Sequence, residues 1–362
     1  MYRNFLSMLL CLPILAFTLA ATAQETFPKA GVGAVPPAAE PPTPSGANRR
    51  VTIDVTVTDS RRMPVAGLSR QDFTLLDNKK PVNIVSFEAF GSAQTPARPD
   101  EVILVVDAVN LKFLYVAYTR QELEKFFRQN EGRLDEPLSI FVTSDTGVSG
   151  MRAPSTNGNA VADALDRFQG GLRLVGRSAG VYGAGERFEM SVRMFMSIVQ
   201  IAARQPGRKL IVWIGRGWPM LGGPGFDSPS EGLQRQYFAA IVRLSTVMRQ
   251  NKITLDSISA GLPDSFTFLY QSYLKGVKSP RYADSANLDE KVIAVQSGGI
   301  VLPPQFNLPG DIQKCIDDAS VFYRLSFDAP PAEKPNEYHA LGVKIAGRGL
   351  KALTNTGYYD EP

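Results

Sequence analysis

The chain has 362 residues, a formal net charge of +4, and 44% hydrophobic and 20% charged residues. So small a charge, scattered over a chain of this length, leaves no basic footprint for a nucleic acid, and no nucleic-acid partner is expected. The length and the hydrophobic fraction suffice for two packed cores, so we expect two folded domains.

The N-terminus carries the three zones of a secretory signal peptide. Arg3 precedes an apolar run from Phe5 to Ala20, and the small residues Ala21-Thr22-Ala23 follow. Cleavage after Ala23 is predicted, which makes residues 1–23 the signal peptide of an exported protein, periplasmic or secreted. The run is short for a membrane span and no second one follows it, so no transmembrane anchor is expected after cleavage.

Residues 24–50 are predicted to be a linker, because they are dominated by Pro, Ala and Gly. This composition cannot bury enough apolar surface to fold and favours an extended, semi-rigid tether. Once the signal peptide is removed, Cys315 is the only cysteine, so no intramolecular disulfide is possible. Cys315 shares one helical face with Ile312, Ile316 and Ala319, which predicts a buried thiol.

Both ends of the mature chain show the period-two alternation of half-buried strands. The simplest arrangement joins residues 51–92 and 330–360 into one discontinuous β-rich domain, and two separate β appendages are the alternative. Residues 77–81 favour a hairpin turn. The predicted strands cover residues 51–58, 73–76, 82–87, 321–327, 338–345 and 350–356.

The middle of the chain, residues 100–328, alternates apolar runs with helix-period segments. The run from Val102 to Val106 is typical of a strand covered on both faces, as in a parallel sheet. Strands that alternate with helices indicate a doubly wound, mainly parallel α/β domain. Further strands are predicted at residues 138–142, 210–214, 253–258 and 300–302, and helices around residues 123–127, 161–168, 195–199, 241–248 and 312–319.

Short motifs follow one another along the mature chain. They lie at residues 55–59, 64–68, 72–78, 103–107, 206–214, 323–327, 349–351 and 357–359. In this order they resemble the VWFA-related acidobacterial domain family of exported bacterial proteins, over nearly all of the mature sequence. The resemblance implies a von Willebrand type A core of Rossmann-like topology, with a metal-ion-dependent adhesion site at the carboxyl ends of the central strands.

The metal pattern that the resemblance implies is an Asp-x-Ser-x-Ser run after the first strand, a Thr from a second loop and an Asp from a third. Here Asp107 stands in the first place, and Thr156 matches the Thr. The two serine places hold Val109 and Leu111, which offer no side-chain oxygen. The third-loop Asp is replaced by Gly215-Arg216-Gly217.

One carboxylate is left where two are usual, and the Arg216 cation opposes a metal ion by like-charge repulsion. We therefore expect no cofactor; the alternative keeps Mg²⁺ or Ca²⁺ on Asp107, Asn110 and Thr156. Without a metal, Asp107 is predicted to be held by backbone amides at the start of the following helix. Asp145 could replace a lost ligand, but its sequence context is typical of a turn.

The loop after residues 210–214 is predicted to lie at the binding edge of the sheet and to display Trp218 and Phe226. Aromatic residues and Arg are enriched in protein interfaces. In the alternative, both aromatic side chains fold back onto the sheet. The long segments 170–187 and 261–287 are further candidate binding elements.

No catalytic residue is predicted, because His339 is the only histidine and lies far from any Gly-flanked serine. The leading hypothesis is a non-catalytic, adhesion-type protein that recognises a protein or cell-envelope ligand through loops at the carboxyl edge of the α/β sheet. The alternatives are a metal-dependent adhesion module, an enzyme of unrecognised type and a structural envelope component. The candidate ligand-binding residues are Asp107, Asn110, Thr156, Arg216 and Trp218.

Overall fold

The computed structural model of the chain describes residues 49–92, 95–151, 153–167, 180–222, 228–261, 268–304 and 306–360. The predicted signal peptide, nearly all of the predicted linker and Phe226 lie outside these residues. All of these described residues belong to one compact unit. Within the described ranges, no helix is both long enough and apolar enough to cross a membrane.

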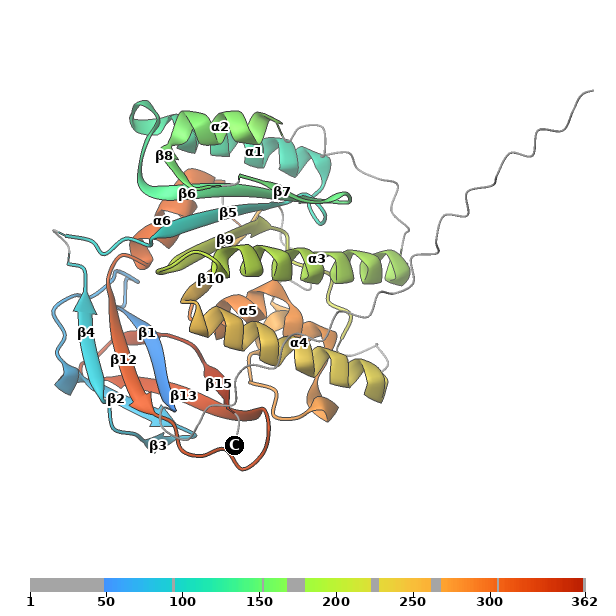
Figure 1. The fold of residues 1–362 in the computed structure, drawn as a ribbon. Helices are drawn as coiled ribbons and strands as arrows, with labels where there is room; N and C mark the ends of the chain where they lie inside the picture. The colour runs from blue at the N-terminus through green and yellow to red at the C-terminus, as the bar shows by residue number, and fades with distance from the viewer. Residues whose placement is uncertain are drawn as a thin grey trace, which may run out of the picture. The chain divides into compact units, whose positions relative to one another are not determined.

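The middle of the chain folds into a mainly parallel sheet (Figure 1). Its strands are β5 (Glu101–Asp107), β6 (Arg133–Ser144), β7 (Gly147–Gly150), β9 (Lys209–Gly215), β10 (Ile253–Ser259) and β11 (Val301–Leu302), and the short β8 (Ser155–Asn157) pairs with β6. The strand order is β11-β10-β9-β5-β6-β7, and only β7 of this path runs antiparallel to its neighbour. Counted along the chain, this is the 3-2-1-4-5-6 order of a doubly wound sheet.

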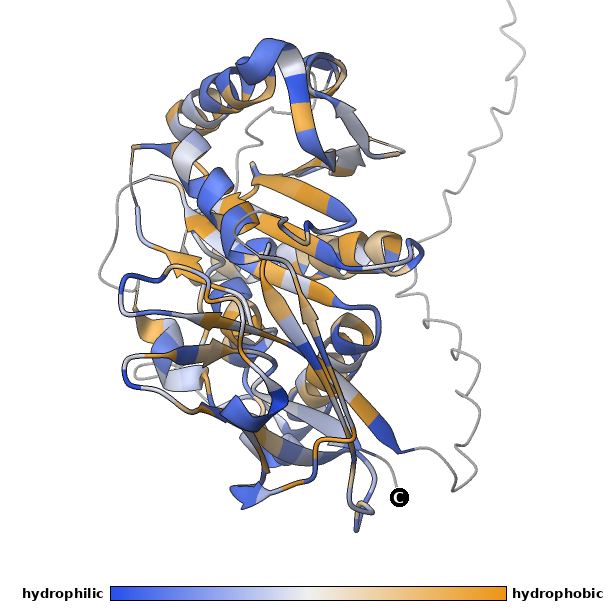
Figure 2. Cartoon of the chain, turned by 90° about the vertical axis from the view of Figure 1, so that its left-hand side faces the viewer, coloured by the Kyte–Doolittle hydropathy of each residue, from blue (hydrophilic) through white to orange (hydrophobic). Residues whose placement is uncertain are grey.

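Helices cover both faces of this sheet (Figure 1). One face packs against α1 (Phe113–Arg128), α2 (Gly158–Arg167) and α6 (Leu308–Asp318), and the other against α3 (Gly180–Ala203), α4 (Glu231–Gln250) and α5 (Glu290–Gln296). Neighbouring β5 residues point to opposite faces, so Leu104 joins the first core and Val105 the second. This two-sided burial explains the continuous apolar runs, which Figure 2 shows as orange stretches along the central strands. Short 3-10 helices lie at Arg70–Asp72, Gln129–Gly132, Leu269–Tyr273, Pro280–Tyr282 and Ser285–Leu288.

Strands from both ends of the chain form two antiparallel sheets that share one core. The first sheet has the order β14-β1-β12-β4, with β14 (Lys351–Leu353), β1 (Arg50–Thr58), β12 (Phe322–Asp328) and β4 (Ser86–Phe90). The second has the order β15-β13-β2-β3, with β15 (Gly357–Asp360), β13 (Glu337–Ile345), β2 (Phe73–Asp77) and β3 (Lys80–Pro81). Val55, Leu75 and Phe327 are buried between them. The predicted hairpin turn is present, with positive φ at Asn78 and Lys79.

The boundary predicted at residue 328 is wrong. β12 pairs with β1, so that Tyr323 lies opposite Val55, and not with the parallel sheet. The Arg324 side chain donates to Asp54 of β1 at 2.8 and 3.0 Å. The α/β part therefore ends after α6, and the β-rich part begins again at Phe322.

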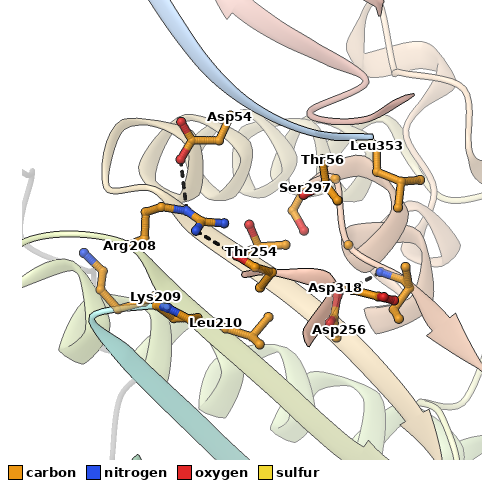
Figure 3. Close-up of a pocket in the computed structure, with 15 residues that line it drawn as sticks. Asp54, Thr56, Arg208, Lys209, Leu210, Thr254, Asp256, Ser297, Asp318 and Leu353 are labelled. Atoms are coloured by element: carbon orange, nitrogen blue, oxygen red, sulfur yellow. Dashed lines mark hydrogen bonds and ion pairs between the residues drawn. The ribbon is translucent and has the colours of Figure 1, made fainter. Parts of the chain in front are cut away.

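A polar seam joins the β-rich part to the amino ends of the parallel strands (Figure 3). The Arg208 guanidinium lies 3.1 Å from the Asp54 carboxylate, donates to the Ala319 carbonyl at 3.0 Å and covers the ring of Phe322. The cavity at this seam measures only about 40 Å³. This is far below the roughly 300–1,000 Å³ of pockets that enclose small ligands.

Candidate functional site at the carboxyl edge of the sheet

Asp107 ends the central strand β5 at the carboxyl edge of the sheet. Its neighbour Val106 lies opposite Ile214 of β9, and Asp107 itself lies opposite Thr143 of β6. The next strand in the chain, β6, pairs with one edge of β5, and the later strand β9 pairs with the other edge. Asp107 therefore lies at the topological switch point, where open α/β sheets usually bind their ligands.

The Asp107 carboxylate is fully buried, and both of its oxygens accept hydrogen bonds from the protein. Oδ1 accepts from the backbone N–H groups of Val109 and Asn110, both at 3.1 Å, and from Thr143 Oγ1 at 3.3 Å. Oδ2 accepts from Asn110 Nδ2 at 2.8 Å and from Trp213 Nε1 at 3.3 Å. Protein donors thus surround this carboxylate, and two of them are backbone amides of the turn that leads into α1, as the sequence predicted for Asp107.

The pKa of Asp107 is raised from 3.8 to about 6. The largest cause is burial, which disfavours the charged form, and the nearby Glu290 carboxylate acts in the same direction. The hydrogen bonds from Asn110 and Trp213 lower the pKa and offset part of this shift. Asp107 is therefore a carboxyl group that gains a proton close to neutral pH.

Asn110 lies beside Asp107, as the sequence predicted for a shared site. Its Nδ2 also donates to Ser191 Oγ of α3 at 2.9 Å, which anchors the β5–α1 turn to that helix. Its buried Oδ1 has no hydrogen-bond partner within the ranges that the structure covers. Asn110 is thus held by the surrounding side chains and keeps one free acceptor.

Thr156 does not lie at this site, so its predicted grouping with Asp107 is wrong. It lies in β8, where its neighbour Ser155 is opposite Leu138, close to the start of β6. Asp107 lies opposite Thr143, at the end of the same strand. Thr143 supplies the hydroxyl that the sequence prediction assigned to Thr156. The signal for Thr143 was its position directly after the predicted strand 138–142, next to the strand that ends at Asp107.

Trp218 is buried rather than displayed, with 4% of its surface exposed. Its ring meets Trp213 and Phe195 edge-on, with centroid distances of 5.4 and 5.7 Å. The predicted display of Trp218 is therefore wrong, and the alternative, in which it folds back onto the sheet, describes its position. Arg216 is half-buried in the same loop, and its carbonyl accepts from Lys291 Nζ at 3.4 Å.

Buried acidic side chains that the sequence prediction missed come from the start of α5. Asp289 caps this helix by accepting from the Lys291 N–H at 3.0 Å, and Glu290 Oε1 accepts from Ser257 Oγ at 3.0 Å. Burial and the adjacent Glu290 raise the pKa of Asp289 well above its ordinary value. A Cβ on Gly217 would lie 2.9 Å from Lys291 Nζ, so this ammonium group takes the space beside the third loop. Nothing local in residues 261–287 indicated that a buried acidic helix start follows them.

In the described ranges, no group of three or more His, Cys, Asp or Glu side chains is arranged to hold a metal ion.

An apolar cleft of about 250 Å³ opens between the first turns of α1 and the carboxyl end of β10. Leu114, Tyr115 and Tyr118 of α1 line it together with Phe306, whose ring meets that of Tyr118 edge-on. The exposed fractions are 73% for Leu114 and 76% for Phe306, so two large apolar side chains face solvent at the mouth. A Cβ on Gly261, whose φ is +103°, would lie 3.2 Å from the Tyr115 ring, so the chain passes close to this ring.

The sequence analysis also missed this cleft, although one signal was present. Leu114 lies on the face of α1 opposite to the buried Leu123 and Phe127. Single exposed apolar residues are common on protein surfaces, so this signal alone does not identify a binding surface.

No family model matches the chain, and no curated protein sequence matches it. Among solved structures, the chain is similar to the human COPII-coat protein Sec24c, with 10% identity over 76% of this chain and a TM-score of 0.35. It spans only 46% of the Sec24c chain. It is also similar to the manganese-loaded TRAP protein of Plasmodium vivax, with 8% identity and a TM-score of 0.33. This match covers 75% of this chain and 97% of the TRAP chain. With TM-scores below 0.5, these likenesses are too weak to support a function.

Proposed function

We infer that this protein is an exported, non-catalytic binding protein of adhesion type, whose α/β part is a von Willebrand type A-like domain with a degenerate metal site. The strand order and the Asp at the end of the central strand support the domain type. The signal-peptide pattern of residues 1–23 supports export, to the periplasm or outside the cell. The ligand is a protein or cell-envelope component, bound at the carboxyl edge of the sheet.

The observation that carries this proposal is the apolar cleft between α1 and the carboxyl end of β10. Exposed apolar surface costs free energy in water, and a cleft rimmed by Leu114 and Phe306 recovers that cost when a partner covers it. Aromatic side chains such as Tyr115 and Tyr118 are enriched in the centres of protein interfaces. The cleft lies at the edge where the fold places ligands, so it replaces Trp218 as the proposed recognition element.

Binding without a metal ion is part of the proposal. Asp107 is enclosed by five hydrogen bonds from protein donors, and Lys291 brings a positive charge to the same edge. The metal-dependent alternative would use Asp107, Asn110 and Thr156, and Thr156 lies at the other end of β6.

The cleft can be tested with the mature chain, residues 24–362, as bait for envelope proteins. The double variant Leu114→Ser, Phe306→Ser should weaken capture of a specific partner by about tenfold or more, because two central apolar contacts are lost. The matched control is Met63→Ser, since Met63 is 57% exposed but belongs to the β-rich part. Equal capture by the mature chain and both variants would contradict the proposed role of the cleft, provided that all three chains unfold at the same temperature.

A further inference from the structure

A cavity of about 220 Å³ lies next to the polar seam, where β1 passes the amino end of β10. It shares Asp54 and Thr254 with the seam, and Figure 3 shows both. Side chains alternate along a strand, so Arg50, Thr52 and Asp54 lie on one face of β1, opposite to its buried apolar residues. The cavity is therefore lined by this polar face of β1, by the last residues of α4 and by the turn into β10.

Positive charge exceeds negative charge around this cavity. Its lining contains three cationic side chains and one carboxylate, those of Arg50, Arg249, Lys252 and Asp54. The carboxylate already pairs with two arginines outside the lining, at 2.8 and 3.1 Å. Arg50 also has a carboxylate partner, at 2.7 Å. In the described part of the chain no carboxylate pairs with Arg249 or Lys252, so these two side chains leave a net positive charge, which attracts anions.

Arg249, in the last turn of α4, is a cation without a hydrogen-bonding partner. Its Nε is buried and has no hydrogen-bond acceptor among the described residues. Its guanidinium carbon lies 5.8 Å from the centre of the Tyr358 ring. Burial lowers the pKa of Arg249, and the nearby Tyr358 and Asp360 offset only part of this effect. Arginine stays charged in proteins, and a buried charge without a partner costs free energy, so an anion in the cavity would stabilise Arg249.

Lys252 occupies a backbone position that favours glycine. It follows Asn251, the C-cap of α4, and has a φ of +53°. Helices often end with glycine at this position, because a Cβ is disfavoured in the left-handed region. A lysine here therefore has a conformational cost, while it places an ammonium group at the cavity. A cation also complements the negative end of a helix, so the test must separate that role from anion binding.

The donors around the cavity suit a phosphoryl group. A guanidinium donates in pairs to phosphate oxygens, and an ammonium group acts as a compact point charge beside it. Hydroxyl and amide side chains add further donors, those of Thr52, Thr254, Gln250 and Asn355. A phosphoryl group has three strong acceptor oxygens and a carboxylate only two, so the phosphoryl group uses these donors more fully. The volume is below the roughly 300–1,000 Å³ of pockets that enclose drug-sized ligands, which favours a small anion.

We propose that this cavity binds a phosphoryl group, held by Arg249 and Lys252 with the hydroxyl and amide donors around them. The phosphoryl group belongs to free phosphate or to a small phosphate monoester, which share the same chemistry. The site lies at the amino end of β10 and the apolar cleft at its carboxyl end, so this proposal does not depend on the proposed function. Because β1, α4 and β10 all line the cavity, a bound anion would also hold the β-rich part against the α/β part.

The test is calorimetric titration of the mature chain, in phosphate-free buffer, with inorganic phosphate, glycerol 3-phosphate and succinate. Saturable binding is expected for at least one of the two phosphate probes. Lys252→Gly and Arg249→Gln should each weaken it by about tenfold or more, because each removes a charge-assisted hydrogen bond. The matched control is Lys79→Gly, since Lys79 is also an exposed lysine with a positive φ, +69°, but lies in the β2–β3 turn. This variant should bind the probes like the mature chain.

Thermal unfolding without phosphate separates the two roles of Lys252. Both glycine variants should unfold at the same temperature as the mature chain or higher, because both relieve a side chain at positive φ. A lower temperature for Lys252→Gly alone, together with undiminished phosphate binding, would show that the lysine serves the helix end and would overturn the site. Saturable heat that is absent for both phosphate probes would also overturn it. Succinate that binds as tightly as phosphate would overturn the phosphoryl class, and the tighter of the two phosphate probes identifies free phosphate or a monoester as the ligand.

Discussion

Replacing Trp218 with alanine is expected to lower the free energy of unfolding by about 3–5 kcal/mol, the usual cost of removing a large buried aromatic side chain. Trp218 is 4% exposed and packs against Trp213 and Phe195, so its removal leaves a cavity under α3. Urea unfolding followed by circular dichroism measures this loss as a lower midpoint at an unchanged slope.

Leu114→Ala is the matching control, because it should affect ligand binding and not stability. Leu114 is 73% exposed, so its truncation should change the free energy of unfolding by no more than about 0.5 kcal/mol while weakening ligand binding. If Trp218→Ala kept the stability of the chain but abolished ligand binding, the result would support the predicted exposed position of Trp218. It would also contradict the proposed role of the cleft.

The second large effect concerns Asp107 and pH. Its pKa is about 6 in the folded chain and 3.8 as the ordinary value, so the folded state binds the proton more tightly. The tighter proton binding stabilises the folded state. This stabilisation is fully present below pH 3.8 and is lost as the pH rises through 6. Relative to an Asp107→Asn variant, the mature chain should therefore lose about 3 kcal/mol of unfolding free energy between those pH values.

Unfolding in urea at several pH values, performed on both chains, gives this difference directly. Buried acids that do not interact with Asp107, such as Asp256 with a pKa raised to about 7 by burial, contribute to both chains and cancel. The Asn side chain also disturbs the hydrogen bonds around position 107, but that cost does not vary with pH. A difference between the two chains that stays constant from pH 4 to pH 7 would show that Asp107 is ionised throughout.

The elements of the α/β part could be predicted from the sequence because their signals are local. Residues 102–106 and 210–214 are continuous apolar runs, and the corresponding strands β5 and β9 extend one residue further at each end. The buried thiol of Cys315 also followed from helical spacing alone. A strand that is covered on both faces needs apolar residues at every position, and β5 and β9 are covered on both faces.

Features that depend on pairing between distant segments could not be predicted in this way. The alternation of residues 321–327 predicts a half-buried antiparallel strand, but only its register with β1, with Tyr323 opposite Val55, shows that β12 belongs to the β-rich part and not to the α/β part. Thr156 matched a motif by spacing but lies at the wrong end of β6. Tryptophan is common in protein interfaces, yet Trp218 is buried because it packs against Trp213 and Phe195.

The central claim is that the carboxyl edge of the sheet binds its ligand without an ion. Calorimetric titration of the mature chain with Mg²⁺ and with Ca²⁺ tests it most directly, up to about 10⁻³ M, the weak limit of extracellular calcium modules. The account predicts no saturable heat for either ion, and the same trace for Asp107→Asn. Saturable binding by the mature chain that Asp107→Asn abolishes would contradict it.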